Sequence, residues 1–319
     1  MTEEIDETGG LEPGAVSVSA SGPMLGTFEA AGVHTGMVIR TTLDPTRQPF
    51  LDDHRIDGTA VLPGAMGIEA FVEVAKLLVP GWQVAAVEDV EFLAPLKFYR
   101  NDPRTLTIRA TVHRDGADVV AECALEGERV LAGSNEPQRT THFTGKVRLT
   151  ANAPEFEHAA AVEEATPAVE SGRVYDFYFH GPAYQVVSSS WRHDGGNAAR
   201  MAEGLPDDHV PMAVPTSVGP RLVELCFQTA GLWEAAQHGR LGLPRHVDKV
   251  RVLRDPAQVT GPLYAVANEI DDHFDCSVLD ASGEVVLTVE GYRTTPLPGP
   301  LPTDIQHDLS QALDELTPV

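Results

Sequence analysis

The chain has 319 residues, a formal net charge of -24 at pH 7 and 42% hydrophobic residues. This length accommodates two domains of ordinary size with real cores, and the negative charge argues against a nucleic-acid partner or an anionic membrane surface. The sequence contains no run of 18 apolar residues, so no membrane-spanning helix is expected. The acidic first 12 residues lack the apolar centre of a signal peptide.

The three cysteines are far apart and outside any Cys-x-x-Cys pattern, which predicts buried thiols in a reducing cytoplasm (Cys123, Cys226 and Cys276). Residues 1–21 are small and acidic and are interpreted as a tail or linker. The next region, 22–150, is predicted to fold as one unit, followed by an Ala-, Glu- and Pro-rich linker over 151–170.

The first unit is organised around a loop and a helix. His54 stands at the head of a glycine-containing loop, and Pro63-Gly64 opens an apolar helix over about 65–79 that ends before Pro80-Gly81. Apolar residues cover most of the helix, which predicts that a curved sheet wraps it. Its polar line, Glu69, Glu73 and Lys76, is expected to face solvent. Alternating patterns around 105–112, 118–125 and 140–149 predict antiparallel strands.

The second half repeats this plan over 171–297. Strand patterns precede a helix over about 221–238, and further strands follow it. The segment at 88–92 follows the first helix at about the distance at which 247–251 follows the second, which indicates an internal duplication. The two sheets are therefore expected to join edge to edge. Residues 298–319, with their prolines and a short amphipathic stretch, are interpreted as a second tail or linker.

Two positions are candidates for proton-transfer chemistry. His54 begins the pattern His-x-x-x-Gly-x-x-x-x-Pro, which is more specific than a lone histidine. On the second helix, Arg221, Glu224 and Gln228 form a polar line at helical spacing in an apolar field. A twofold pairing of the repeats would bring the histidine and the carboxylate into one pocket, as an acid/base couple requires. We expect burial to keep His54 neutral and to raise the pKa of Glu224, so that it retains a proton.

The ordered motifs resemble the dehydratase domains of type I polyketide synthases and animal-type fatty acid synthases. His54, Gly58 and Pro63 reproduce the histidine motif of that family, and 180–185 (His-Gly-Pro-Ala-Tyr-Gln) resembles its Gly-Pro-x-Phe/Tyr motif. The segment 219–228 matches its proline, acid and glutamine motif, with Glu224 in place of the usual aspartate. Leu243-Pro244 and 291–293 also fit. The sequence of residues 56–69 is most similar to that of iterative systems making polyunsaturated or enediyne-type chains.

The resemblance implies an α+β double hotdog fold and the dehydration of a 3-hydroxyacyl chain carried as a phosphopantetheine thioester on an acyl carrier protein. It implies no metal and no cofactor of its own. In this mapping His54 takes the α-proton and Glu224 protonates the leaving hydroxyl. Gln228 holds the hydroxyl or carboxyl, the Gly64 amide polarises the thioester carbonyl, and Tyr184 shapes the pocket with Pro63 and Gly58. Other synthase domains, and a second copy of the chain, are expected partners.

Alternatives with the same fold remain: a double-bond isomerase, a cyclase or pyran-forming domain, a product-template domain, or a non-catalytic hotdog pair that binds acyl carriers. A serine hydrolase and a zinc hydrolase lack their motifs in this sequence. One basic island is predicted to dock the acidic carrier protein; it comprises Arg245, His246, Lys249, Arg251 and Arg254.

Overall fold

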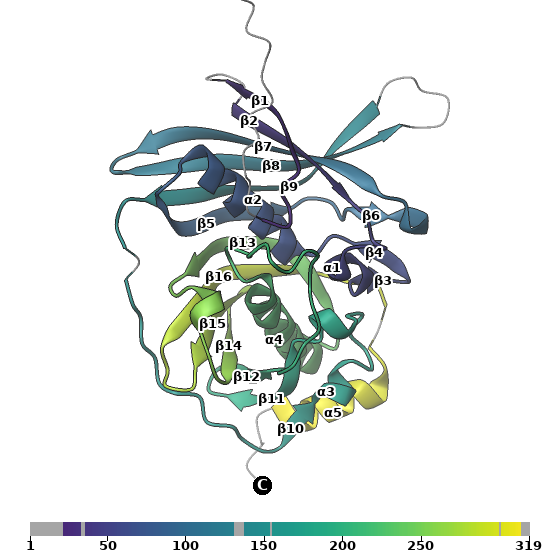
Figure 1. The fold of residues 1–319 in the computed structure, drawn as a ribbon. Helices are drawn as coiled ribbons and strands as arrows, with labels where there is room; N and C mark the ends of the chain where they lie inside the picture. Colours follow the sequence, from purple (N-terminus) through teal and green to yellow (C-terminus); the bar gives the residue numbers. More distant parts are fainter. Residues whose placement is uncertain (1–21, 33–35, 131–136, 154, 300, 314–319) are drawn as a thin grey trace, which may run out of the picture.

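The computed structural model describes residues 22–32, 36–130, 137–153, 155–299 and 301–313. The tail expected over residues 1–21 lies outside these ranges. The described residues form two helix-in-sheet units that stack one above the other, with α2 in one and α4 in the other (Figure 1). None of the helices described is long and apolar enough to cross a membrane.

In the N-terminal unit, one antiparallel sheet curls around α2 (Gly64–Leu78), with the strand order β1-β2-β7-β8-β9-β5. A small second sheet, in the order β3-β4-β6, carries the loop before the helix. The strands are β1 (Thr27–Gly32), β2 (Gly36–Leu43), β3 (Arg55–Ile56), β4 (Thr59–Val61), β5 (Gln83–Phe92), β6 (Lys97–Phe98), β7 (Arg104–Asp115), β8 (Asp118–Val130) and β9 (Pro137–Thr150), with the short helices α1 (Pro49–Asp52) and η1 (Tyr99–Asn101).

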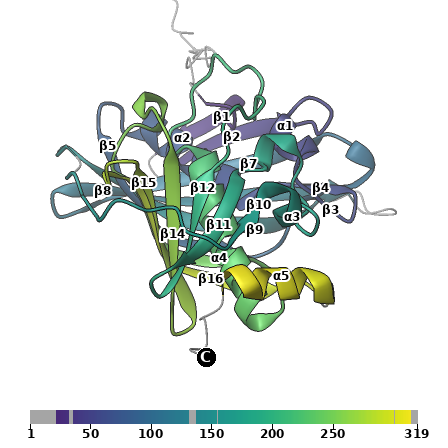
Figure 2. The ribbon, with the colours of Figure 1, turned by 90° about the horizontal axis from the view of Figure 1, so that it is seen from below.

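The C-terminal unit repeats the design around α4 (Pro220–His238), as Figure 2 shows from below. Its strands run in the order β13-β16-β15-β14-β12-β11-β10. They are β10 (Ala168–Glu170), β11 (Val187–His193), β12 (Gly196–Met201), β13 (Gly242–Val252), β14 (Leu263–Ile270), β15 (His273–Asp280) and β16 (Val285–Pro296), with α3 (Ser171–Val174), η2 (Pro182–Tyr184) and η3 (Pro256–Gln258). Almost all of α4 is buried, because both the sheet and α2 cover it.

The two sheets join edge to edge between β5 and β13, as predicted. Val90 pairs with Val247 and Val87 with Val250, in antiparallel register. These strands directly follow α2 and α4, so the two sheets join through equivalent strands of the internal repeat. The result is a single 13-stranded antiparallel sheet among the described residues. The expected α+β double hotdog is confirmed.

The ends of the folded region differ from the expected boundaries. Residues 151–167 contain no helix or strand in their described part and run along the outside of both units (Figure 1). At the other end, the stretch interpreted as a tail contains α5 (Thr303–Leu313), which packs on α4. Ile305, Leu309 and Leu313 of α5 are buried at i, i+4 and i+8. The packed structure thus extends to Leu313 rather than ending at 297.

The polar line expected to face solvent on the first helix is the clearest error. Glu69 is 0% and Glu73 2% exposed. Glu69 accepts hydrogen bonds from the backbone N–H groups of Ser217 and Val218, at 2.5 and 2.8 Å, and Glu73 accepts one from Met24 N at 3.0 Å. The polar line is therefore covered by two backbone segments whose amides need acceptors. Only Lys76, whose Nζ donates to Ser217 Oγ at 3.1 Å, remains outside.

Candidate active site

His54 is held at the end of α1 by the loop that follows it. Its Nδ1 lies 2.8 Å from the carbonyl oxygen of Val61. Because a carbonyl only accepts hydrogen bonds, Nδ1 carries the proton and Nε2 is left with a free lone pair. Arg55 braces the same loop by donating to Asp52 Oδ1 at 2.6 Å and to the carbonyl of Gly58 at 3.2 Å. Gly58 adopts a φ of 74°, which favours glycine.

The electrostatics of His54 suit a base. Burial, and after it the neighbouring His180, lower its pKa to about 4, although Glu224 and the Val61 hydrogen bond partly oppose the shift. His54 is therefore neutral at pH 7, as predicted for a histidine in an apolar environment. The edge of its ring faces Phe179, with centroids 5.1 Å apart.

Glu224 and Gln228 lie one turn apart on the buried face of α4. Gln228 Nε2 donates to Glu224 Oε1 at 3.1 Å and to the carbonyl of Tyr184 at 2.9 Å. Gln228 Oε1 accepts a hydrogen bond from the Tyr175 hydroxyl at 2.7 Å. These three hydrogen bonds fix the orientation of the Gln228 side chain. Gln228 therefore positions Glu224.

His180 is a site residue that the sequence analysis missed. Residues His54 and His180 form an isolated antiparallel β-bridge between the two units, which sets the two imidazole rings 5.3 Å apart. His180 Nε2 lies 3.0 Å from Glu224 Oε1, and both side chains are buried. Neither ring nitrogen of His180 has an aligned hydrogen-bond partner among the described residues, so the approach to Glu224 is a close polar contact rather than a well-aligned hydrogen bond. The signal available in the sequence was a histidine directly before Gly181-Pro182, read only as part of a turn motif.

The bridge depends on a close approach of two backbones. Gly181 N donates to Asp53 O at 2.7 Å, and Ala183 N donates to Asp53 Oδ2 at 2.7 Å. A Cβ at Gly181 would lie 2.3 Å from Asp53 Oδ1, so only glycine fits there. The Gly-Pro motif thus locks the second unit onto the residue before His54.

The expected protonation of Glu224 is wrong. Burial acts to raise its pKa, but the close contact with His180, the nearby His54 ring and the Gln228 amide outweigh burial and lower the pKa below 4.5. The sequence-based expectation considered only the apolar neighbours on the helix. It could not include a histidine 44 positions earlier in the chain. Glu224 is consequently a carboxylate at neutral pH.

These side chains face a cavity of about 220 Å³ at the contact between the two units. Its walls are mainly apolar and aromatic and include Ile56, Leu62, Phe92, Phe143, Phe227 and Tyr292. Gly64, the first residue of α2, also lines it, and a Cβ there would lie 2.7 Å from the Phe92 ring. The first N–H groups of a helix have no partner within the helix, so the Gly64 amide is available to an oxygen in the cavity.

The structure does not bring every expected residue to the cavity. His54, Gly64, Glu224 and Gln228 line it, whereas Gly58, Pro63 and Tyr184 do not. Tyr184, the last residue of η2, is buried, and its carbonyl accepts a hydrogen bond from Gln228. Arg221, on the same polar line, donates to the Ala183 carbonyl at 2.9 Å and lies 3.4 Å from Asp208, so its role here is structural.

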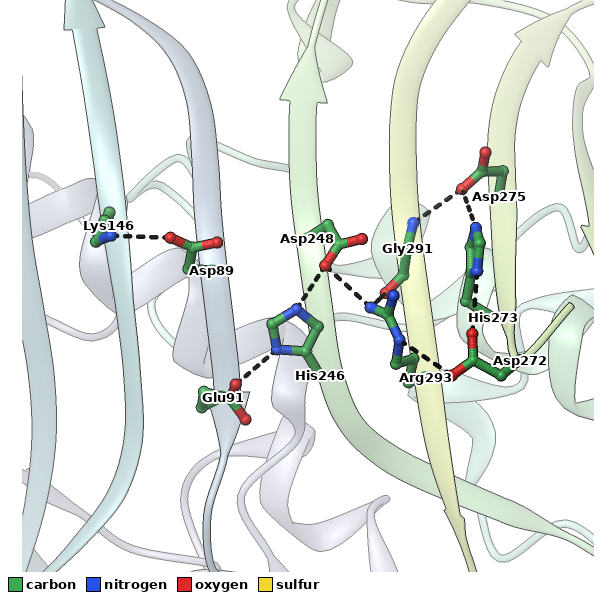
Figure 3. Close-up of polar contacts among 10 residues, drawn as sticks. All are labelled: Asp89, Glu91, Lys146, His246, Asp248, Asp272, His273, Asp275, Gly291 and Arg293. Atoms are coloured by element: carbon green, nitrogen blue, oxygen red, sulfur yellow. Dashed lines mark hydrogen bonds and ion pairs between the residues drawn. The ribbon is translucent and has the colours of Figure 1, made fainter. Parts of the chain in front are cut away.

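The basic island predicted for carrier docking lies on β13 and is largely paired with carboxylates. His246 is held between Glu91 and Asp248, at 2.8 and 2.7 Å (Figure 3). Arg251 contacts Glu157 and Glu290, and Arg254 contacts Asp280 and Glu284. No ion pair of Arg245 or Lys249 is found among the described residues. Docking at this island stays a prediction.

The cysteines lie outside the network described above. Cys123, Cys226 and Cys276 are free and buried, as expected. Within the described ranges, no group of three or more His, Cys, Asp or Glu side chains is arranged to hold a metal ion.

Two family models match the chain. The "Polyketide synthase dehydratase domain" model matches residues 22–121, and the "Polyketide synthase dehydratase N-terminal domain" model matches residues 153–304. Among curated proteins, the phthioceranic/hydroxyphthioceranic acid synthase of Mycobacterium tuberculosis (strain ATCC 25618 / H37Rv) is 28% identical over 258 residues, which are 77% of this chain and 12% of that protein. Pikromycin polyketide synthase component PikAII of Streptomyces venezuelae is 26% identical over 88% of this chain and 7% of its own length. The chain therefore spans only a small part of these relatives.

Solved structures show the same fold. The dehydratase domain from the CurF module of curacin polyketide synthase has a TM-score of 0.72 at 18% identity, covering 87% of this chain and 100% of that domain. The dehydratase domain of a mycocerosic acid synthase-like polyketide synthase has a TM-score of 0.68 at 22% identity, covering 87% and 97%. The two matching models, the arrangement of the repeats and the solved relatives agree. The chain belongs to the dehydratase domains of polyketide synthases.

Proposed function

We propose that this domain removes water from a 3-hydroxyacyl thioester to give the enoyl thioester during polyketide synthesis. The observation that carries the proposal is the placement of a neutral histidine and a buried carboxylate–histidine pair around one apolar cavity. Elimination of water needs a base for the α-proton and an acid for the β-hydroxyl. His54 comes from one repeat, and Glu224 and His180 come from the other, so the joint between the repeats assembles the site.

His54 is the base. Its Nε2 lone pair takes the α-proton, while the Val61 carbonyl holds the proton on Nδ1. The Gly64 amide receives the thioester oxygen, where negative charge develops as the Cα–H bond breaks. Because the cavity is apolar, this interaction is stronger than it would be in water.

The acid is the Glu224–His180 pair rather than Glu224 alone. An ionised Glu224 has no proton to give, so in this proposal it receives the proton that it donates from His180, whose Nε2 lies 3.0 Å from Glu224 Oε1. In this mechanism the pair delivers that proton to the β-hydroxyl as the Cβ–O bond breaks, and water leaves. Glu224 Oε1 faces both His180 and Gln228, whereas no partner of Oε2 is found among the described residues. Oε2 is the oxygen that faces the substrate.

The substrate is proposed to arrive as a phosphopantetheine thioester on an acyl carrier protein, delivered within a larger synthase. The domain acts without a metal or cofactor of its own in this proposal, because His54 and the Glu224–His180 pair supply both proton transfers. Support for the synthase context comes from the curated relatives, of which a chain of this size is a small part. A cytoplasmic location is part of the same proposal.

The test is incubation of the protein with a 3-hydroxyacyl carrier protein, followed by mass spectrometry for the loss of water. We expect His54→Ala and Glu224→Gln each to lower kcat by about 10² to 10⁴, because each removes one proton transfer. Circular dichroism would check that both variants remain folded. Solved relatives include inactive variants of the CurK dehydratase in which an aspartate or a histidine is replaced.

The same assay separates this function from its same-fold alternatives. An isomerase or a cyclase rearranges its substrate without losing water, so an unchanged product mass with an altered retention time would contradict dehydration. Full activity of Glu224→Gln would show that the acid lies elsewhere.

A further inference from the structure

A second hollow, of about 960 Å³, gathers positive charge on a strongly acidic protein. It lies between η1 and the β7–β9 strands, and its lining contains Lys97, Arg100, Arg104 and Arg129. No carboxylate of the described residues lies within ion-pair distance of any of these four. Asp102 also lines the groove but contacts none of them. Most other arginines of this protein are ion-paired, including Arg148, which contacts three carboxylates.

One of these cations, Arg104, lies close to a buried histidine of the same lining. A Cβ built on Gly127 would lie 3.1 Å from Arg104 Nη2 and 2.7 Å from His142 Nε2. Burial and then the charge of Arg129 lower the pKa of Arg104, so the two guanidinium groups repel each other. His142 is 5% exposed, and its Nε2 has no hydrogen-bond partner among the described residues. A like-charge pair beside an unpartnered imidazole is an arrangement that an anion would stabilise.

The turn that presents Arg100 is strained and tied to the catalytic loop. Arg100 and its neighbour Asn101 both adopt a φ of 59°, which is uncommon for residues other than glycine. Asn101 is held by a 2.9 Å hydrogen bond from Arg55, the residue after His54. In addition, Lys97 pairs with Val61, whose carbonyl orients His54. Strain of this kind persists where the surrounding structure enforces it, often at binding sites.

The groove adjoins the catalytic cavity. Pro95 lines both, and the side chains of His142 and Phe143, neighbours on β9, line the groove and the cavity respectively. Leu93, which lines the cavity, is 57% exposed, so the cavity reaches the surface beside Pro95. A ligand with an apolar end in the cavity and an anionic end in the groove would pass over Pro95.

We propose that the groove binds the phosphate of the pantetheine arm that carries the substrate, with Arg104 and Arg129 as its principal ligands. The inference rests on the proposed function, because it assumes a substrate on such an arm. Two guanidinium groups suit a phosphate, which they bind through several charge-assisted hydrogen bonds. Lys97 and Arg100 extend the positive field toward the approaching partner. This assignment places the anionic end of the substrate on the N-terminal unit, away from the ion-paired residues of β13.

The test compares 3-hydroxyacyl thioesters of phosphopantetheine and of pantetheine, which differ only in the phosphate. For the wild type we expect a KM about tenfold or more lower for the phosphorylated substrate, in line with charge-assisted hydrogen bonds. Arg129→Gln and Arg104→Gln should each reduce this preference by raising KM for the phosphorylated substrate. Arg129 makes no hydrogen bond among the described residues, so its variant should fold normally. The matched control is Arg114→Gln, which removes an exposed charge from the other end of β7 and should keep the preference.

Several results would overturn the assignment. If the preference survives in both variants, the groove does not bind the phosphate. If the variants raise KM only for substrate on intact carrier protein, the groove recognises an acidic protein surface instead. An equal rise for the pantetheine thioester would mean a distorted cavity. Charge reversal at Arg251 and Arg254 that raises KM, with no effect of Arg129→Gln, would place docking on β13.

The proposal is separable from the proposed function by direct binding. If the wild type dehydrates none of the thioesters, the function fails, but calorimetry with phosphopantetheine and pantetheine still tests the groove. Binding of the phosphorylated compound alone, lost in Arg129→Gln, supports the site. Equal affinity for the two compounds refutes it.

Discussion

His54 and His180 lie side by side, yet only His180 touches a carboxylate. Burial keeps His54 neutral, and the Val61 carbonyl holds its proton on Nδ1, so Nε2 is free, whereas His180 lies 3.0 Å from Glu224. One β-bridge thus supplies a base and half of an acid from adjacent backbones. The two histidines differ in role because they differ in partner, which is the Val61 carbonyl for His54 and Glu224 for His180.

Replacement of His180 should change the pH dependence of the reaction rather than simply slow it. In His180→Phe the burial of Glu224 is no longer opposed by the His180 imidazole, so the pKa of Glu224 rises and the carboxyl itself becomes the acid. The proton donor is then lost as pH rises through the pKa of Glu224 alone. We expect the alkaline limb of the kcat/KM profile to move to lower pH, with a loss of about 10²-fold or more at pH 8.

The polar variant His180→Gln serves as the control. Glutamine donates a hydrogen bond to Glu224 but does not titrate, so the variant should keep the geometry and still show a displaced alkaline limb. An unchanged profile in both variants would mean that Glu224 needs no proton from His180.

The length of the acid side chain gives a second residue-scale prediction. The family resemblance implies an aspartate at the position that Glu224 occupies in this chain. Glu224→Asp would retract the carboxyl from His180 and Gln228, which are placed for glutamate, and a shift of about 1 Å affects a step that depends on geometry. We expect a partial loss of kcat, smaller than that of Glu224→Gln, measured in the same water-loss assay.

At this scale motif spacing and helical periodicity, which are local signals, predicted His54 and Glu224 at the cavity, and the family resemblance implied Gln228 and Gly64 there. It did not predict His180 or the ionisation of Glu224. Both depend on a bridge between residues 54 and 180, and no local pattern encodes a contact over that separation.

Among the elements, α2 carries an unusual pair of buried acids. Burial raises the pKa of Glu69 and, with the charge of Glu69, raises the pKa of Glu73 well above 4.5, and the two carboxyls hydrogen-bond each other. The periodicity of the helix was read correctly, but its polar line was placed in solvent. The residues that cover it, Met24, Ser217 and Val218, come from distant segments that show no hydrophobic signal pointing to α2.

These acids should make the protein less stable as pH rises. A carboxyl whose folded-state pKa is raised stabilises the fold while protonated, and this contribution is lost as pH increases from 4.5 through the folded value. Glu73→Gln keeps a donor for Glu69 and an acceptor for Met24 without titrating. We expect this variant to unfold at higher denaturant concentration than the wild type at pH 8, with the difference vanishing near pH 4.

Glu69→Gln is the informative contrast, because Ser217 N and Val218 N use both carboxylate oxygens. An amide has one acceptor oxygen, so one backbone N–H loses its partner, at a cost of about 1–3 kcal/mol. Equal effects of Glu69→Gln and Glu73→Gln in denaturant titrations would contradict the assignment of the proton to Glu73 and of the two backbone hydrogen bonds to Glu69.

For the whole molecule, the duplication visible in the sequence predicted the architecture well. Two helices with the same flanking strands implied two wrapped units, and the two equivalent strands β5 and β13 form the joint. The packing of α5 on α4 was not predicted, because its four buried residues form a short pattern in a proline-rich context. Likewise the paired state of Arg251 and Arg254 depends on partners spread over three other segments.

The exposed crossing at residues 151–153 carries none of the interactions that unite the halves, which are the β5–β13 ladder, the bridge at His180 and the α2–α4 contact. The linker therefore keeps the two repeats at a high effective concentration but makes none of the contacts that hold them together. Co-expressed fragments cut at this crossing should associate and recover dehydratase activity, whereas each fragment alone, holding either His54 or Glu224, should have none. Gel filtration and the water-loss assay on the mixed fragments would show whether two genes could encode what is here one chain.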